Sequence, residues 1–328
     1  MTKRYKKKAA IKKMNALGTF KTPFFFLIDF EMKKIIIEPN FNYTDSFLFT
    51  INGLSNHKKS PAVVVDTPFI EAQPLSFKKY KKGFDLVTSE IQNGNSYLLN
   101  LTYPTKLKSN VSLEEIYNLT DAKYKVLLKE KFVCFSPEIF VIIKNNRISS
   151  FPMKGTIDAN IENAQETLLN DKKELAEHYT IVDLIRNDIG IVATDITVNR
   201  FRYIEKLKTN KKNLLQASSE ISGNLPSDWS NSIGDILFNL LPAGSISGAP
   251  KQKTIEIIKT AEKSKRSYYT GICGIFDGVN LDTGVMIRYI EKKKDKLYYR
   301  SGCGITSMSD INTEYQEMID KVYLPLNK

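Results

Sequence analysis

The feature of this sequence that most limits its fold is the recurrence of short apolar runs bounded by residues that favour turns. The runs are rich in Phe, Ile and Val, and pairs such as Asn52-Gly53 separate them. Such side chains fit the pleated, half-buried surface of a sheet, so the runs predict strands. In the opening third of the chain we expect strands at Phe24 to Phe30, Lys34 to Glu38, Ser46 to Ile51, Ala62 to Val65 and Tyr97 to Tyr103.

Helical patterns interrupt these strands. Apolar residues recur every three or four positions over Ser76 to Gln92 and over Leu175 to Ile189, as one face of a helix requires. Ser112 followed by Glu115 forms a capping box at the start of a further helix. We also expect helices at Ser232 to Leu240, Lys251 to Ala261 and Asn312 to Tyr323, strands at Val192 to Tyr203, and either a strand or a short helix at Asn213 to Leu225.

Composition narrows the class of protein. A chain of 328 residues with 42% hydrophobic content can bury a large core, and no linker or repeat divides it. We therefore expect one domain over residues 1–328. The net charge of +12 comes mainly from lysine clusters near turns, without a stacking-aromatic motif, so we expect solvated surfaces and no nucleic-acid partner.

The cysteines and the apolar runs indicate in which cellular compartment the protein is expected. Cys134, Cys273 and Cys303 form neither a disulfide framework nor a metal-ligand spacing, which fits a reducing cytoplasm. No apolar run approaches the length of roughly 18 residues that spans a bilayer. The basic start lacks the apolar region of a signal peptide, so we expect a soluble, cytoplasmic protein without a membrane partner.

The first candidate for chemistry is Lys154 in the turn FPMKGT, Phe151 to Thr156. A hairpin predicted over Lys131 to Phe151 leads into this turn. Pro152 fixes its own φ, and Gly155 has no Cβ, so a ligand can approach the backbone next to the lysine. Lys154 is thus either a nucleophile facing a ligand or one of many solvated turn lysines.

Two pairs of glutamates are candidates for a metal site. Glu174 and Glu177 lie three positions apart on one predicted helix, as do Glu314 and Glu317 on another. This spacing puts both members of a pair on one helical face. If the two helices faced each other, their carboxylates would form an oxygen-only site of the kind that Mg²⁺ prefers. The alternative is ordinary exposed helix charge.

Other candidates are an anion site and an arginine. The run LPAGSISGAPK, Leu241 to Lys251, lacks the ending of a Walker A loop but precedes a helix, where free N–H groups favour a carboxylate or a phosphate. The alternative is a purely structural turn before that helix. Arg288 lies inside the apolar strand GVMIRYI and is suited to bidentate binding of a carboxylate. Gly302 and Gly304 interrupt another strand, which indicates close approach of a backbone or a ligand.

Five motifs in order resemble the chorismate-utilising enzymes, which include anthranilate synthase and aminodeoxychorismate synthase components I and the isochorismate and salicylate synthases. The motifs are FPMKGT, KELAEHYTIVDLIRND, LPAGSISGAPK, YYTGICGIFDG and SGCGITSMSDINTEYQEMIDK. The resemblance runs from about Gly94 to Lys321, and so divides the expected domain into a shortened N-terminal part, about 1–93, and a catalytic core, about 94–328. It implies an α+β fold of four layers, α/β/β/α, with two orthogonally packed antiparallel sheets and a site between them.

Two positions distinguish the branches of this family. Isochorismate and salicylate synthases activate water with a lysine where this chain has Leu98. Anthranilate synthases carry a small residue at the position of Lys154, whereas aminodeoxychorismate synthases carry lysine there. The resemblance therefore favours the aminodeoxychorismate synthase component I branch, an amino-group transferase of p-aminobenzoate and folate biosynthesis, with anthranilate synthase component I as the alternative.

The resemblance also implies roles for residues. Lys154, deprotonated by its environment, would attack C2 of chorismate while Glu138 protonates the leaving C4 hydroxyl, and ammonia would then expel the lysine. Glu177 and Glu317 would bind Mg²⁺ with support from Glu174 and Glu314, and the metal would bridge to the ring carboxylate. The same carboxylate would be held by Gly155, Thr156, Ser245 and Lys321, and the enolpyruvyl carboxylate by Arg288, Tyr269 and Gly302.

The chain departs from the family at two points and implies a partner. Gln216 stands where the family often has a histidine, and the short N-terminal part implies that the tryptophan pocket of long anthranilate synthases is absent. The chain has no glutaminase cysteine motif, so ammonia would come from a separate glutamine amidotransferase subunit. His178 has no nucleophile motif near it, and we expect it to have a packing or supporting role.

Overall fold

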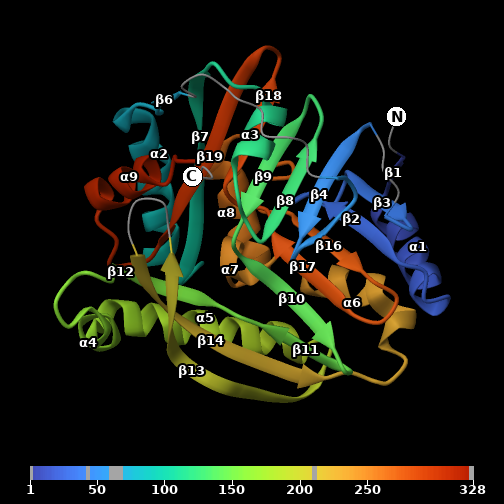
Figure 1. Cartoon of the computed structure of the whole chain (residues 1–328). Helices are drawn as coiled ribbons and strands as arrows, with labels where there is room; N and C mark the ends of the chain where they lie inside the picture. The colour runs from blue at the N-terminus through green and yellow to red at the C-terminus, as the bar shows by residue number, and fades with distance from the viewer. Residues whose placement is uncertain (1–2, 42–44, 59–68, 209–212, 325–328) are drawn as a thin grey trace.

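The computed structural model of the chain describes residues 3–41, 45–58, 69–208 and 213–324. Its strands form two sheets, and every strand pair in the described residues is antiparallel. This confirms the α+β prediction with two antiparallel sheets. In Figure 1, strands of one sheet run across the lower part of the molecule next to α5 (Lys172–Gly190), and strands of the other stand upright in the upper part.

The first sheet has ten described strands. In spatial order they are β1 (Arg4–Tyr5), β3 (Ile35–Pro39), β2 (Phe24–Ile28), β16 (Ile272–Phe276), β17 (Leu281–Val285), β10 (Ile139–Lys144), β11 (Arg147–Ser150), β14 (Asn213–Asn224) and β12 (Met153–Asp158), with β13 (Thr194–Lys208) on the other edge of β14. The run FFFLI of β2 is buried at every position because neighbours cover both of its faces.

The second sheet has nine described strands. In order they are β15 (Gly248–Ala249), β7 (Leu98–Ser109), β19 (Lys296–Ile305), β18 (Tyr289–Lys293), β9 (Phe132–Ser136), β8 (Tyr124–Leu128), β4 (Phe47–Ile51) and β5 (Leu54–Ser55), with β6 (Ile70–Gln73) beside β7. Strands from before residue 94 pair with later strands in both sheets, as β2 does with β16 and β4 with β8.

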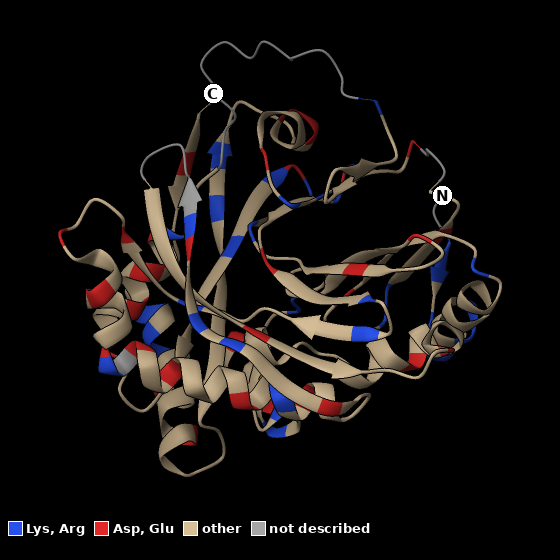
Figure 2. Ribbon diagram, turned by 60° about the horizontal axis from the view of Figure 1, so that its bottom comes forward, with Lys and Arg blue, Asp and Glu red and all other residues tan. Residues whose placement is uncertain are grey.

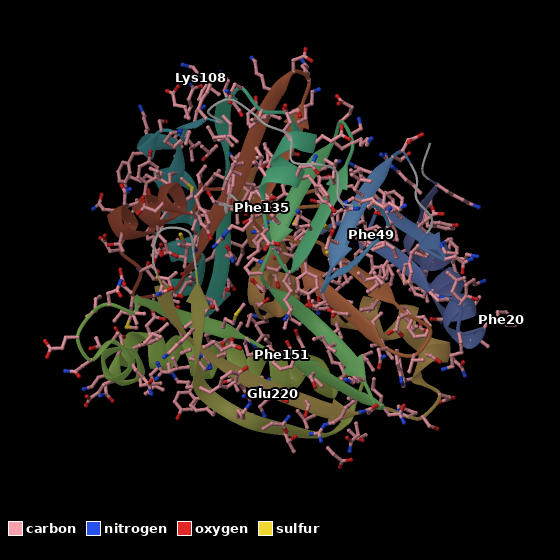
Figure 3. All side chains as sticks on the ribbon, viewed as in Figure 1. Phe20, Phe49, Lys108, Phe135, Phe151 and Glu220 are labelled. Carbon is pink, nitrogen blue, oxygen red and sulfur yellow. The ribbon has the colours of Figure 1, made fainter. Side chains whose placement is uncertain are left out.

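An aromatic core joins the two sheets. Phe25 of β2 stacks on Phe49 of β4, with ring centroids 4.3 Å apart and planes 5° apart. Phe47 and Tyr124 from the second sheet and Cys273 from the first are fully buried in the same cluster. Figure 3 labels Phe49 on its strand. Large rings of this kind contribute most of the apolar area that drives sheet packing.

Helices cover the outer faces of the sheets. On the first sheet lie α4 (Ala164–Asn170) and α5 at one end, and α1 (Lys7–Thr19), the 3₁₀ turn η1 (Trp229–Ser232) and α6 (Ile233–Leu240) at the other. On the second lie α2 (Phe77–Gln92), α8 (Lys251–Glu262), α9 (Ile311–Asp320) and the short α3 (Leu113–Leu119), while α7 (Gly244–Ser247) lies between α5 and β7.

Most predicted elements are present, although some differ in their bounds and others were not predicted. The capping box of α3 forms as expected, with the Ser112 hydroxyl accepting from the Glu115 N–H. Helix α1 was not predicted, and α9 ends at Asp320 rather than at Tyr323. Residues 213–224 form a strand, β14, and the strand expected at Ala62 to Val65 lies outside the described residues.

Candidate functional site

Two chain segments cross from one sheet to the other, and each carries a candidate residue. Glu138 lies between β9 of the second sheet and β10 of the first, and Arg288 lies between β17 and β18. The crossings are linked because the Val285 N–H donates to the Glu138 carbonyl at 3.0 Å and the Phe135 N–H to the Arg288 carbonyl at 3.1 Å. Arg288 has a φ of 52°, a left-handed conformation that is uncommon for a residue with a side chain and often marks a functional position.

All thirteen candidate residues line one cleft of about 2500 Å³ at these crossings. The sequence therefore predicted a set that the fold brings together from both sheets and from three helices. The thirteen are Lys154, Glu138, Gly155, Thr156, Ser245, Tyr269, Arg288, Gly302, Lys321, Glu174, Glu177, Glu314 and Glu317. Two further positions also line the cleft: Leu98, which distinguishes branches of the resembled family, and Gln216, where the family often has a histidine.

Lys154 projects from β12 toward the second sheet. Its ammonium group forms an ion pair with Glu177 of α5, and its side chain is 29% exposed. On the opposite wall, a Cβ built on Gly304 would lie 3.7 Å from the Lys154 Nζ. The amine therefore lies between a carboxylate and a glycine backbone inside the cleft, not in bulk water.

Gly155 makes room for a glutamate beside this lysine. Its φ of 80° is in the left-handed region, and an added Cβ would lie 3.2 Å from the Glu174 Oε2 and 2.9 Å from the Leu168 Cδ1. A side chain at this position would be strained and crowded. Glycine thus lets the turn after Lys154 pack against the glutamates at the start of α5.

Glu138 lies among cations but remains easy to protonate. The Ser245 hydroxyl donates to its Oε1 at 2.9 Å. Burial raises the pKa of Glu138 above its ordinary value, and the Ser245 hydrogen bond and the charges of Arg288, Lys321 and Lys154 offset only part of this rise. A carboxyl group with a raised pKa is suited to act as a general acid near neutral pH.

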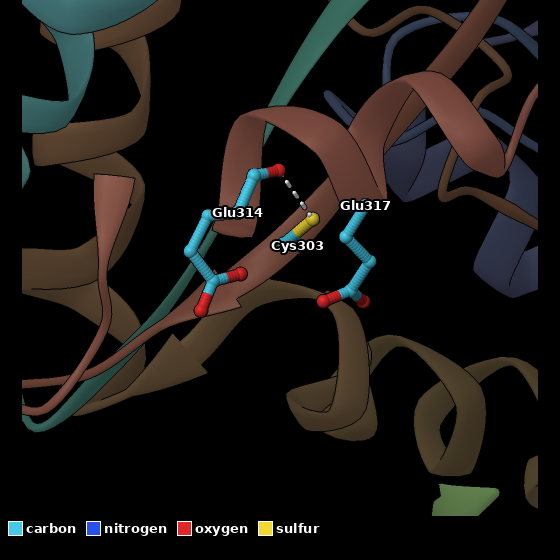
Figure 4. Close-up of side chains that lie close together, drawn as sticks. All are labelled: Cys303, Glu314 and Glu317. Carbon is cyan, nitrogen blue, oxygen red and sulfur yellow. Dashed lines mark hydrogen bonds between the residues drawn. The ribbon is translucent and has the colours of Figure 1, made fainter. Parts of the chain in front are cut away.

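Figure 4 shows the side chains of Glu314 and Glu317 of α9 with Cys303 between them, and both glutamates line the cleft. Candidate ligand atoms of Cys303, Glu314 and Glu317 lie within 4.8 Å of one another. The thiol of Cys303 is not a suitable ligand, because burial raises its pKa and it donates to the Glu314 carbonyl at 3.3 Å. The remaining donors are carboxylate oxygens, which suit a hard divalent cation.

The predicted carboxylate-binding residues on this wall contact one another. The Lys321 ammonium donates to the Gly302 carbonyl at 3.0 Å and forms an ion pair with Glu317 at 2.6 Å. Ser245 lies in α7, in the run Leu241 to Lys251. This run forms the helix α7 and the strand β15, which pairs with Leu98 and Leu99 of β7. The run is therefore part of the cleft wall.

His178 has the supporting place expected from its sequence. It is fully buried and its Nε2 lies 2.7 Å from the Ser219 hydroxyl. Burial, together with the nearby charge of Arg202, lowers the pKa of His178 to about 4, so the ring is neutral at pH 7. His178 belongs to α5 and lies near Lys154, but it is not among the residues that line the cleft.

Sequence analysis missed two features of the cleft. Tyr323 lies beside Arg288, with its hydroxyl accepting from the Arg288 Nε at 3.1 Å. Behind the wall, Glu262 accepts from two buried arginines, Arg266 and Arg300, each at 2.6 Å. The four-residue spacing of Glu262 and Arg266 and the arginine inside the strand YYRSGCGI were the available signals.

Charge is distributed over the whole molecule. Lys and Arg alternate with Asp and Glu along strands and helices of both sheets (Figure 2). In the part of the chain that the structure describes, no helix combines the length and the hydropathy needed to cross a bilayer.

Comparisons with known proteins match this chain to a family. Residues 4–327 match the family described as chorismate binding enzyme. An uncharacterized PabA-like protein of Haemophilus influenzae is 53% identical over 317 residues, covering 96% of both chains. The aminodeoxychorismate synthase component 1 of Bacillus subtilis is 30% identical over 77% of this chain and 56% of its own length, and the anthranilate synthase component 1 of Acetivibrio thermocellus is 32% identical over 70% and 49%.

A solved structure shares the fold. The menaquinone-specific isochorismate synthase of Escherichia coli superposes with a TM-score of 0.72 over 97% of this chain and 82% of its own, at 17% sequence identity. At that identity the likeness concerns the fold alone.

Proposed function

Since the chain belongs to the chorismate-binding enzyme family, we propose that it acts as an aminodeoxychorismate synthase component I, which converts chorismate and ammonia to 4-amino-4-deoxychorismate. The observation that carries the proposal is a lysine, Lys154, whose amine lies inside the cleft between Glu177 and the backbone of Gly304. An amine in that place can act as a nucleophile toward a bound ring.

The proposed reaction has two displacement steps. The amine nitrogen of Lys154 forms a bond to C2 of chorismate and loses a proton, both double bonds of the ring diene shift, and the C4–O bond breaks. Glu138 gives its proton to the departing hydroxyl, which leaves as water; its raised pKa supports this role. Ammonia then bonds to C4 and loses a proton, both ring double bonds shift back, and the bond from C2 to Lys154 breaks as the lysine nitrogen regains a proton.

The cleft offers cationic and polar groups for both carboxylates of chorismate. Arg288 lies at a crossing between the sheets and Tyr269 also lines the cleft; both would hold the enolpyruvyl carboxylate together with the backbone of Gly302. Ser245, Lys321, Gly155 and Thr156 would hold the ring carboxylate. Arginine supports this arrangement because its planar fork matches a carboxylate.

We propose Mg²⁺ as the cofactor, held by Glu177 and Glu317 with support from Glu174 and Glu314. The all-carboxylate donor set fits this ion, and a bound Mg²⁺ would offset the negative charge of the ring carboxylate. Glu177 and Glu317 also form ion pairs with Lys154 and Lys321, so the proposed ligands lie beside the proposed nucleophile and a proposed carboxylate-binding lysine.

Ammonia would come from a separate glutamine amidotransferase subunit. A glutaminase needs a reactive thiolate, but Cys134, Cys273 and Cys303 are all buried. Burial raises the pKa of each, to about 12 for Cys273, so none is a reactive nucleophile at neutral pH. We place the protein in the cytoplasm, where p-aminobenzoate synthesis would supply folate.

A product assay separates this proposal from anthranilate synthase component I. The purified protein is incubated with chorismate, Mg²⁺ and ammonium, and the products are identified by mass spectrometry. We expect 4-amino-4-deoxychorismate, with its enolpyruvyl group intact. Release of pyruvate together with fluorescent anthranilate would establish the alternative, and recovery of chorismate alone would argue against both.

A further inference from the structure

The Arg288 guanidinium is held by a tyrosine that follows the last described helix. The Tyr323 hydroxyl accepts a hydrogen bond from the Arg288 Nε at 3.1 Å, and the Arg288 Cζ lies 5.1 Å from the centroid of the Tyr323 ring. The same tyrosine therefore fixes the group by a directed bond and by a cation–π contact. We propose that Tyr323 is a positioning residue that orients Arg288 toward a carboxylate of the substrate, an inference that rests on the proposed function.

The contact leaves the carboxylate-binding atoms of Arg288 available. Within the described residues, neither Nη1 nor Nη2 of Arg288 donates a hydrogen bond to the protein. Those two nitrogens form the end of the guanidinium that can pair with both oxygens of a carboxylate. Tyr323 thus binds the side of the guanidinium that the carboxylate does not need, and does not compete with it.

A second acceptor explains why Arg288 needs to be held. The hydroxyl of Tyr299 is buried without a hydrogen-bond partner, and it interacts electrostatically with Arg288. A buried polar group without a partner carries a free-energy cost, so a mobile guanidinium would tend to turn toward it. Tyr323 instead binds the guanidinium from the cleft, since this tyrosine is 42% exposed and lines the cleft.

The place of Tyr323 in the chain supports this role. It lies two residues after Lys321, whose ammonium contacts Glu317 and the Gly302 carbonyl. The end of α9 and the residues after it therefore reach both predicted carboxylate sites. Because Arg288 lies at a sheet crossing with a left-handed backbone, the orientation of its side chain depends on such contacts and not on a regular strand.

The test measures chorismate binding by calorimetry and steady-state kinetics in Tyr323→Phe and Tyr323→Ala. Tyr323→Phe loses the hydrogen bond with the charged Arg288 side chain, which should raise Kd and KM for chorismate about five- to tenfold. Tyr323→Ala also loses the ring and should raise both further. We expect kcat to change less than about twofold, because Tyr323 touches no reacting atom. Tyr298→Phe is the matched control, since a lysine also lies over its ring, but outside the cleft.

A double-mutant cycle separates positioning from a general structural effect. In an Arg288→Ala background, Tyr323→Phe should cause no further loss of binding, because the hydroxyl acts only through the guanidinium. Equal Kd values for wild type and Tyr323→Phe, or a full additional loss in the double variant, would overturn the inference alone. A wild-type protein that does not bind chorismate would overturn the proposed function and this inference with it.

Discussion

Lys154 is the residue on which the proposed chemistry depends, and removing its amine gives the first prediction. In Lys154→Ala we expect the formation of 4-amino-4-deoxychorismate to fall at least about 1000-fold, because the covalent step loses its nucleophile. Chorismate binding should change only a few-fold, since the carboxylates are held by other residues. Mass spectrometry measures the first and calorimetry the second. Lys144→Ala, an exposed lysine at the end of β10, is the control.

An unchanged rate in Lys154→Ala would contradict the covalent mechanism but leave the family assignment intact. Loss of both turnover and binding would indicate that the amine mainly holds the cleft together through its ion pair with Glu177.

Glu138 gives a prediction about pH. Its pKa is raised above the ordinary value of 4.5, so the folded protein holds this proton more tightly than the unfolded chain does. The stability contributed by the bound proton is complete below the unfolded pKa and is lost as the pH rises through the folded pKa. Glu138→Gln, which stays neutral, should therefore melt about 1–3 °C above wild type at pH 8. At pH 4 the variant and the wild type should melt at the same temperature.

The same substitution removes the proposed acid. Turnover in Glu138→Gln should fall by roughly 100- to 10,000-fold, the usual contribution of a positioned acid or base. A variant that is less active and yet more stable would show that the carboxyl group is kept for chemistry at a cost in stability. Lower stability at pH 8 would mean instead that the charges of Arg288, Lys321 and Lys154 outweigh the effect of burial.

At this scale the sequence was informative about chemistry and not about contacts. The thirteen candidate residues could be named because motifs fix their types and order. Two contacts could not be predicted from the sequence: the pairing of Lys154 with Glu177, 23 residues away, and the pairing of Arg288 with Tyr323. Such partners depend on how β12 meets α5 and where the chain turns after α9, which no local pattern records.

Among the elements, β19 shows how two glycines in one strand can serve different purposes. A Cβ on Gly302 would lie 2.1 Å from the Leu101 carbonyl oxygen of β7, which is backbone and cannot move aside. A Cβ on Gly304 would meet the Leu98 Cδ1 at 3.1 Å and the Lys154 Nζ at 3.7 Å, which are the ends of side chains. The first glycine is needed for sheet pairing and the second for space under the amine.

This difference predicts opposite outcomes for two alanine variants. Gly302→Ala should lower the free energy of unfolding by about 1–3 kcal/mol or more, as overpacking does in a well-packed core. Gly304→Ala should remain close to wild type in stability but lose about ten- to a hundredfold in kcat/KM, because its methyl group shifts the amine. Urea denaturation and steady-state kinetics measure the two effects. A reversed order would contradict this account.

Element boundaries were predicted well where the pattern was strong. The helix expected over Leu175 to Ile189 is α5, and the buried residues of α2 follow its predicted apolar face. Helix α1 was missed because lysines dominate its sequence, although its buried residues Ala10, Met14 and Leu17 keep helical spacing. Helix α9 ends before the predicted Tyr323, and Lys321 and Tyr323 line the cleft. The spacing of apolar residues does not report such contacts with the cleft.

At the scale of the whole molecule, the candidate site lies where the chain passes from one sheet to the other. Glu138 and Arg288 are adjacent only because two separate crossings, more than a hundred residues apart, run side by side. The sequence showed short strands and turns but not which strands cross, since pairing between distant strands is set by the packing of the complete core. The two-sheet architecture was therefore available from the family resemblance and not from the strand pattern.

Behind the cleft, a buried ionic cluster ties the second sheet to its helices. Glu262 of α8 accepts from Arg266 and Arg300 and from the Thr102 N–H of β7, and the side chains of all three charged residues are at most 1% exposed. Arg266 also donates to the Ile246 carbonyl at 3.0 Å, next to Ser245. The cluster thus connects the core to the wall that contacts Glu138.

Neutralising this glutamate gives the last prediction. Glu262→Gln would leave two buried guanidinium groups without their counter-charge, which typically lowers the free energy of unfolding by about 3–5 kcal/mol. Glu256→Gln on the same helix should change it by less than about 1 kcal/mol, because the Lys253–Glu256 pair is solvent-exposed, with the Glu256 side chain 58% exposed. Urea denaturation at low and high salt measures both. Salt should not reduce the stability lost in Glu262→Gln, since buried charges are poorly screened. Equal losses of unfolding free energy in the two variants would show that the cluster does not hold the second sheet together.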